Sequence, residues 1–166
     1  MIFETNRLSI RKLTQDDFQA FHEMQNNPKV LEFVVGRGFT EEENRKQLKG
    51  CIEKYSKLDN DFWVWAVIRK SDNEFVGTCA VIGDKDENSN EIGYRFLEKY
   101  WGNGYGSEIC NGLINHCIDS MNLKSIFATV DVRNIGSVKI LDNSKLPFIK
   151  EYMNEGVLDR YYKLEL

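Results

Sequence analysis

A glycine-rich run between residues 91 and 108 carries the residues best suited to chemistry. It reads EIGYRFLEKYWGNGYGSE, with Gly102, Gly104 and Gly106 at every second position. Because glycine has no Cβ, it adopts unusual dihedrals and lets a ligand approach the backbone closely. A helix that begins there would add unpaired N–H groups and partial positive charge, which bind phosphate groups. The run predicts an anion site, although a tight strand-to-helix turn also needs glycine for steric reasons.

Two common nucleotide motifs do not fit this run. A P-loop requires a lysine directly after its last glycine, but no lysine follows any glycine of the run, and Ser107 follows Gly106. A dinucleotide fingerprint requires G-x-G-x-x-G/A, and Ser107 stands in place of its last glycine. Binding of a generic nucleotide, such as ATP or NAD, stays open as a function of the loop.

The run resembles a known family. Residues 100–108 resemble the acyl-CoA signature, Q/R-x-x-G-x-G/A, of the GNAT N-acetyltransferases, in the branch that includes ribosomal-protein N-terminal (Rim-type) acetyltransferases. Residues 5–11 (TNRLSIR) resemble the first strand of that branch, and residues 134–137 (NIGS) resemble its Asn-x-x-Ser helix start. Two features depart from the pattern. Trp101 stands where the superfamily has Gln or Arg, and residues 141–148 replace the usual Leu-Glu-Lys-x-Gly-Phe.

This resemblance implies a fold and an activity. The fold would be a single GNAT-like α/β (α+β) domain over residues 1–166, with a mixed, mostly antiparallel central sheet of about seven strands and about four helices. The fourth and fifth strands, at residues 91–97 and 125–131, would be parallel because a helical crossover joins them. The activity would be acetyl transfer from acetyl-CoA to a primary amine, a protein N-terminus or a small amine, by direct attack in a ternary complex. A non-catalytic acyl-CoA sensor or interaction module is the alternative.

The resemblance also assigns cofactor-binding residues to three segments. Backbone groups of the fourth strand would bind the pantetheine arm, the glycine turn would bind the pyrophosphate, and the Asn-x-x-Ser helix start would reach the pantetheine. The residues so assigned are Gly93, Tyr94, Arg95, Phe96, Leu97, Trp101, Gly102, Asn103, Gly104, Tyr105, Gly106, Ser107, Asn134 and Ser137. A simple helix N-cap is the alternative role for Asn134.

Two residues are the main candidates for proton transfer. Glu91 occupies the position that relatives use as a water-mediated general base; the alternative is an exposed carboxylate at a strand end. Ser137 or water would assist the leaving thiolate, because Leu141 stands where many superfamily members have tyrosine. Tyr94 and Tyr105 are weaker candidates for this role. An α-amine with a pKa of ~8 needs less help from a base than a lysine near 10.4.

The acceptor amine would meet a different segment. In the family, the region that corresponds to residues 30–39 forms one wall of the acceptor cleft. Phe33, Arg37 and Phe39 are therefore candidate substrate contacts, although loop packing would explain the two aromatic residues equally well. Relatives are monomers or homodimers, and no apolar stripe in this sequence decides between the two states.

Composition limits the other classes of function. A net charge of −4 argues against nucleic acid as a partner. Hydrophobic residues make up 42% of the chain, and no apolar run approaches the ~20 residues that span a bilayer. The first residues do not resemble a signal peptide. We therefore expect a cytoplasmic protein without membrane contact. The cysteines lack C-x-x-C spacing and only two histidines are present, so no metal site is expected. The cysteines are Cys51, Cys79, Cys110 and Cys117.

Hydrophobic periodicity and capping residues predict the order of the elements. We expect strands at residues 7–13, 62–68, 75–82, 91–97 and 125–131, and a closing hairpin at residues 148–153 and 157–166. We expect helices after Thr14, after Thr40, after Gly106 and over residues 134–141.

Overall fold

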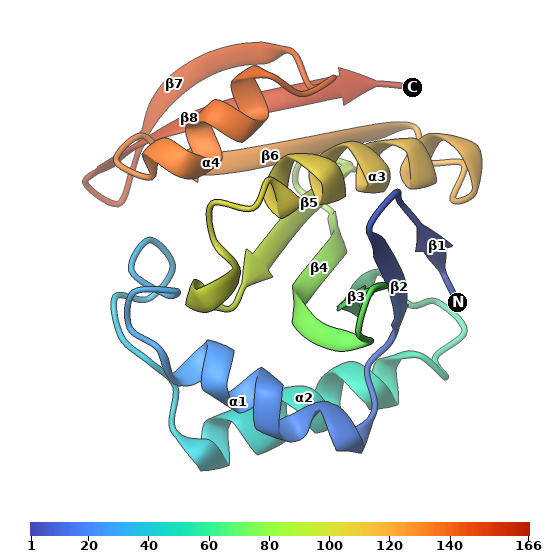
Figure 1. The fold of residues 1–166 in the computed structure, drawn as a ribbon. Helices are drawn as coiled ribbons and strands as arrows, with labels where there is room; N and C mark the ends of the chain where they lie inside the picture. Colours follow the sequence, from blue (N-terminus) through green and yellow to red (C-terminus); the bar gives the residue numbers. More distant parts are fainter.

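The computed structural model describes residues 1–166 as one mixed sheet with helices on both faces (Figure 1). The strands are β1 (Phe3–Glu4), β2 (Leu8–Lys12), β3 (Phe62–Arg69), β4 (Glu74–Asp84), β5 (Ser89–Phe96), β6 (Ser125–Asp131), β7 (Phe148–Asn154) and β8 (Val157–Glu165). The helices are α1 (Phe18–Asn26), α2 (Glu41–Lys54), α3 (Tyr105–Asp119) and α4 (Ile135–Asp142). Short 3₁₀ helices cover Gln15–Asp17 and Glu98–Tyr100. No helix combines the length and the apolar character needed to cross a bilayer.

The sheet confirms the predicted fold class and its parallel pair. Its order is β1-β2-β3-β4-β5-β6-β8-β7, and every neighbouring pair is antiparallel except β5 and β6. These two strands are the expected fourth and fifth strands, because β1 adds an eighth strand ahead of the predicted set. A two-residue strand is too short to show an alternating pattern. Phe3 nevertheless pairs with Ile10 and stacks on His116 of α3.

The two faces of the sheet bury separate hydrophobic clusters. Trp65 and Val67 of β3 belong to the cluster that contains residues of α3 and α4. Ala66 and Ile68 point the other way, into the cluster that contains residues of α1 and α2. Figure 1 shows α1 and α2 together on one side of the sheet and α3 on the other. The alternation of side chains along each strand therefore fixes which helices cover which face.

A capping box starts α2 as the sequence predicts. The Glu43 N–H donates to the Thr40 hydroxyl at 3.2 Å, and the Thr40 N–H donates to the Glu43 carboxylate at 2.7 Å. Each residue thus satisfies a backbone donor that the first helical turn leaves unpaired. This fixes the start of α2 beside the loop that contains Phe39.

A fork between β5 and β6 interrupts the sheet. β5 pairs with β4 over its whole length, from Ser89 to Phe96. Its pairing with β6 is confined to two positions, Asn90 with Ile126 and Glu91 with Phe127, whereas β6 pairs with β8 along its full length. Beyond Glu91, one edge of β5 therefore lacks a neighbouring strand. An extended molecule can bind to such an edge as an added strand would.

Candidate active site

Glu91 lies at the last paired position of the fork. Its Oε1 accepts a hydrogen bond from the Thr129 hydroxyl of β6 at 2.8 Å, and its side chain is partly buried. Burial raises the pKa of Glu91 above its ordinary value, and the nearby charge of Asp84 adds to the rise, while the Thr129 hydrogen bond opposes it. A carboxylate with a raised pKa is suited to accept a proton near neutral pH.

Gly93 and Arg95 share the sheet face of Glu91, because side chains alternate along β5. A Cβ added at Gly93 would meet no atom within 4 Å, so open space adjoins the backbone there. The Arg95 guanidinium reaches α1 and donates to the side-chain oxygen of Gln25. The Gln25 side-chain N–H donates in turn to the side-chain oxygen of Gln47 of α2 at 2.9 Å. Burial lowers the pKa of Arg95. The open backbone at Gly93 fits close approach of a thioester arm.

Tyr94 and Ser137 approach each other on the opposite face. Tyr94 packs against the cluster beneath α3, and its hydroxyl is buried without a hydrogen-bond partner. Burial raises the pKa of Tyr94, while Ser137 lies near enough to lower it slightly, although no hydrogen bond joins the two. The phenol therefore stays protonated at neutral pH. An orphaned donor at this depth fits an acceptor supplied by a ligand.

The glycine turn presents a row of unused backbone donors. Gly102 and Gly104 have φ values of +75° and +78°, which glycine adopts without strain. The N–H groups of residues 102–107 donate to no acceptor in the chain, and the first bond into α3 runs from Glu108 to the Gly104 carbonyl at 3.2 Å. The positive end of the helix dipole adds to these donors. The turn therefore fits a pyrophosphate group.

Gly106 also serves packing, which was the alternative explanation for the glycines. A Cβ added there would lie 2.6 Å from Ile140 Cδ1 and 3.8 Å from the Tyr94 ring. Glycine at this position lets α3 pack against Ile140 of α4 without displacing the end of that side chain. The packing explanation therefore applies at Gly106, whereas Gly102 and Gly104 meet the need of the turn for positive φ.

At the end of β5, two residues predicted to bind the cofactor already have backbone groups that are hydrogen-bonded within the chain. The Phe96 carbonyl accepts the Trp101 indole N–H at 3.0 Å, and the Leu97 N–H donates to the Val76 carbonyl at 3.0 Å. The Leu97 side chain is buried between the sheet and α1. The Phe96 carbonyl is thus occupied, whereas the Leu97 N–H faces β4. Because backbone directions alternate along a strand, the Tyr94 N–H and carbonyl face the open edge, at the centre of residues 93–95. Trp101, at the signature position, is joined to the strand end by its indole hydrogen bond, and the residue is about half exposed.

Asn134 caps α4, which was the alternative role given to it. Its side-chain oxygen accepts the Ser137 N–H at 3.2 Å. The cap places Ser137 in the first turn of α4, close to Tyr94. Leu141, on the same helix, is buried in the core and supplies no proton.

The three residues predicted to contact the acceptor amine lie in two different places. Arg37 pairs with Glu43 at 2.7 Å and lies over the Phe39 ring at 5.2 Å, at the start of α2. Phe33 instead lies beneath Arg133, whose guanidinium carbon is 5.9 Å from the ring centroid. Arg133 follows β6, so Phe33 is the member of the set that lies beside a strand of the fork.

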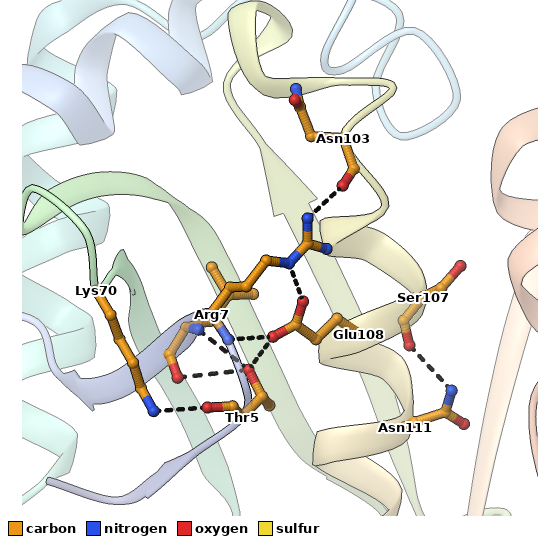
Figure 2. A network of polar contacts seen from close by, with 8 residues as sticks. Thr5, Arg7, Lys70, Asn103, Ser107, Glu108 and Asn111 are labelled. Atoms are coloured by element: carbon orange, nitrogen blue, oxygen red, sulfur yellow. Dashed lines mark hydrogen bonds and ion pairs between the residues drawn. The ribbon is translucent and has the colours of Figure 1, made fainter.

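Sequence reasoning missed the residues that support the site from distant segments. Thr129 bonds Glu91, and Figure 2 shows Thr5 and Arg7 reaching the start of α3 to bond Glu108 and the backbone of Asn103. Residues 5–11 matched the family pattern, yet nothing in a single sequence pairs them with residue 108. No group of three or more His, Cys, Asp or Glu side chains is arranged to hold a metal ion.

Comparison with known proteins agrees with this geometry. Residues 7–145 match the model of the Acetyltransferase (GNAT) domain. The chain is 29% identical over 160 residues to the uncharacterized N-acetyltransferase p20 of Bacillus licheniformis, covering 96% of this chain and 86% of the relative. It is 30% identical over 141 residues to the uncharacterized N-acetyltransferase YnaD of Bacillus subtilis, covering 85% and 79%.

Solved structures share the whole fold. A GNAT-family acetyltransferase from Bacillus anthracis superposes with a TM-score of 0.84 and 24% identity, covering 98% of this chain and 96% of that one. RimL, a ribosomal L7/L12 α-N-protein acetyltransferase in complex with CoA, superposes at 0.82 with 17% identity, covering 99% and 97%. Spermidine N-acetyltransferase from Vibrio cholerae, in complex with CoA and spermine, superposes at 0.79 with 16% identity, covering 96% and 95%.

The forked sheet and the glycine turn at a helix start therefore fit an acyl-CoA-dependent transferase. The matches to known sequences and structures identify the family of this transferase. The chain belongs to the GNAT family of acetyltransferases. It is an acetyl-CoA-dependent N-acetyltransferase, which confirms the activity and the family predicted from the sequence.

Proposed function

We propose that this enzyme acetylates a primary amine by direct attack in a ternary complex, with Glu91 as the general base. The observation that carries the proposal is the position of Glu91. A partly buried carboxylate with a raised pKa lies where β5 and β6 separate, two residues from the open backbone at Gly93. Acetyl-CoA supplies the acetyl group as a thioester that an amine can attack.

Three sets of groups in the chain would hold acetyl-CoA. The free amides of residues 102–107 would bind the pyrophosphate, and the open edge of β5 at residues 93–95 would bind the pantetheine arm. Near the thioester, the backbone N–H of Tyr94 would polarise the carbonyl, because the Arg95 N–H faces β4 in the antiparallel pairing. The buried, unpartnered Tyr94 hydroxyl would lie on the other side of the strand, near Ser137, where either hydroxyl can donate to the leaving sulfur.

Glu91 would remove the proton from the amine, directly or through one water. Thr129 holds one carboxylate oxygen and leaves the other oxygen free of hydrogen bonds within the chain. Because the pKa of Glu91 is raised, the carboxylate is a stronger base than an exposed glutamate. The negative charges of Glu91 and Asp84 would also attract a cationic amine.

We propose two acceptor classes, a protein N-terminal α-amine and a small polyamine or aminoglycoside. The structural neighbours that act on ribosomal L7/L12 and on spermidine support both classes alike. Phe33, beside the end of β6, and the Arg37–Phe39 pair at the start of α2 are the proposed substrate contacts.

The test is a panel of amines incubated with acetyl-CoA. Peptides with a free N-terminus, spermidine, spermine and an aminoglycoside should be scored by thiol release and by the mass gain of the acceptor. Peptides with a blocked N-terminus are the matched control. Initial velocities at varied concentrations of both substrates should give intersecting lines, whereas parallel lines would contradict direct transfer. Addition of ATP or NAD should not compete with acetyl-CoA.

A further inference from the structure

We propose that Arg7 is a positioning residue for CoA, which holds the glycine turn in the conformation that points its amides at the pyrophosphate. The inference rests on the proposed role of this turn in the function above. Arg7 comes from the segment between β1 and β2, far from the turn in sequence, and it belongs to no CoA signature.

The Glu108 carboxylate gathers three donors from this segment (Figure 2). Its Oε1 accepts the Thr5 hydroxyl at 2.5 Å and the Arg7 backbone N–H at 2.7 Å, and its Oε2 accepts the Arg7 Nε at 2.7 Å. Burial by itself raises the pKa of Glu108, but the hydrogen bonds from Thr5 and Arg7 outweigh it, so the pKa is lowered. The carboxylate therefore stays ionised at neutral pH and fixes the guanidinium.

The fixed guanidinium then bonds the turn. Arg7 NH1 donates to the backbone carbonyl of Asn103 at 2.9 Å, and the guanidinium lies over the Tyr105 ring at 4.7 Å. In a trans peptide, the carbonyl and the following N–H point in opposite directions. By holding the Asn103 carbonyl, Arg7 turns the N–H of Gly104 away from itself. That N–H has no acceptor in the chain.

The turn has a particular need for such a restraint. Asn103 lies between two glycines with positive φ, and glycine imposes little restriction on the backbone. No lysine or arginine lies within residues 102–107, and Trp101 stands where the signature has Gln or Arg. Arg7 supplies a side-chain cation that bonds the turn directly. Its guanidinium also lies close to Gly104, because a Cβ added at Gly104 would be 3.4 Å from Arg7 NH2.

Arg11, on β2 just after the segment that holds Arg7, offers a matched control. Its guanidinium pairs with the Asp17 carboxylate at 2.7 Å, the distance of the Arg7–Glu108 pair, and the exposed fractions of the two arginine side chains are 40% and 45%. Arg11, however, bonds the start of α1 and not the glycine turn. Loss of either arginine removes a similar ion pair, but loss of Arg7 alone releases Asn103.

The experiment compares Arg7→Ala and Arg11→Ala with the parent enzyme, by calorimetric titration with CoA and by steady-state kinetics. Since a charge-assisted hydrogen bond contributes roughly 1.5–3 kcal/mol, we expect Arg7→Ala to weaken CoA binding about tenfold or more. The KM for acetyl-CoA should rise in parallel, while kcat and the KM for the acceptor stay near the parent values. Arg11→Ala should lower the melting temperature and leave CoA affinity unchanged.

Glu108→Gln provides a second variant that keeps the shape of the side chain. It should weaken CoA binding in the same direction, and the double variant with Arg7→Ala should bind no worse than Arg7→Ala alone, because both act through one contact. Parent-like CoA affinity in folded Arg7→Ala, or additive effects in the double variant, would overturn the inference while leaving the proposed function intact. Failure of the parent to bind CoA would instead reject the proposed cofactor site.

Discussion

At the scale of single residues, the chemistry depends on how the fold changes the proton affinity of Glu91. The strand-end position alone would leave an ordinary exposed carboxylate. Partial burial at the fork and the charge of Asp84 raise the pKa, and Thr129 limits the rise while it orients the group. The same fork leaves Tyr94 protonated and unpartnered on the opposite face. A base and a hydrogen-bond donor thus flank the edge of β5.

Replacement of Glu91 by Gln tests its role as the base. We expect kcat to fall by about 10²–10⁴-fold, because the loss of a positioned general base has effects of that size, while CoA affinity stays unchanged. In the parent, kcat/KM for the acceptor should rise with pH through a midpoint above the ordinary carboxyl pKa of 4.5. This limb should vanish in Glu91→Gln.

Asp84→Asn is the control for that pH profile. Removal of the neighbouring charge should lower the pKa of Glu91 and move the limb toward lower pH without abolishing activity. A Glu91→Gln variant that keeps the parent kcat and pH limb would exclude Glu91 as the base.

At the scale of elements, the pairing of β4 with β5 sets the open edge that the cofactor needs. Gly77 of β4 lies opposite Phe96, at the end of β5. A Cβ added at Gly77 would lie 2.1 Å from the Arg95 carbonyl oxygen and 3.0 Å from Phe96 Cα, so the two strands approach each other more closely than any other residue would allow. This contact is with backbone, which cannot move aside without a shift of the strand.

Gly77→Ala should therefore destabilise the fold and disturb the site. Overpacking costs about 1–3 kcal/mol or more, so we expect a loss of at least that size in the free energy of unfolding, measured in urea. Gly50→Ala, in the middle of α2, is the control because a Cβ there meets no atom within 4 Å. That change should stabilise the protein by roughly 0.5–1 kcal/mol. Equal effects of the two substitutions would contradict the packing argument.

The limits of sequence reasoning appear most clearly at this scale. Runs of β-branched and aromatic residues predicted β3, β4 and β6, and the glycine spacing predicted the turn, because each of these signals is local in the chain. The contacts of Arg7 with Glu108 and of Thr129 with Glu91 were not predictable. They depend on the register and packing of segments about a hundred and about forty residues apart, and alternation by itself does not specify a partner strand.

At the scale of the whole molecule, burial of the cysteines in the core argues against catalysis through a cysteine nucleophile. Cys79, Cys110 and Cys117 belong to the cluster beside α3, and Cys51 to the cluster beside α2; all are free and buried. Burial raises the pKa of each thiol, to about 11 for Cys110 and about 12 for Cys117. The thiols therefore stay protonated at neutral pH, which argues against an acetyl-cysteine intermediate.

Treatment of the native enzyme with iodoacetamide at pH 7.5 tests this point. We expect full retention of activity and no alkylation by mass spectrometry, followed by alkylation of all the cysteines once urea unfolds the chain. Rapid inactivation of the native protein with modification of one cysteine would point to a nucleophilic thiol and contradict the account.

The most direct test of the central claim, that CoA binds along the open edge of β5 and over the glycine turn, is millisecond hydrogen exchange with and without CoA. The amides of residues 102–107 have no acceptor in the chain, so they should exchange at nearly unprotected rates in the free enzyme. Saturation with CoA should slow exchange there and at Tyr94, whose N–H faces the open edge, and leave β7 and α2 unchanged. Protection confined to other segments, or none at all in a protein that binds CoA, would contradict the assigned site.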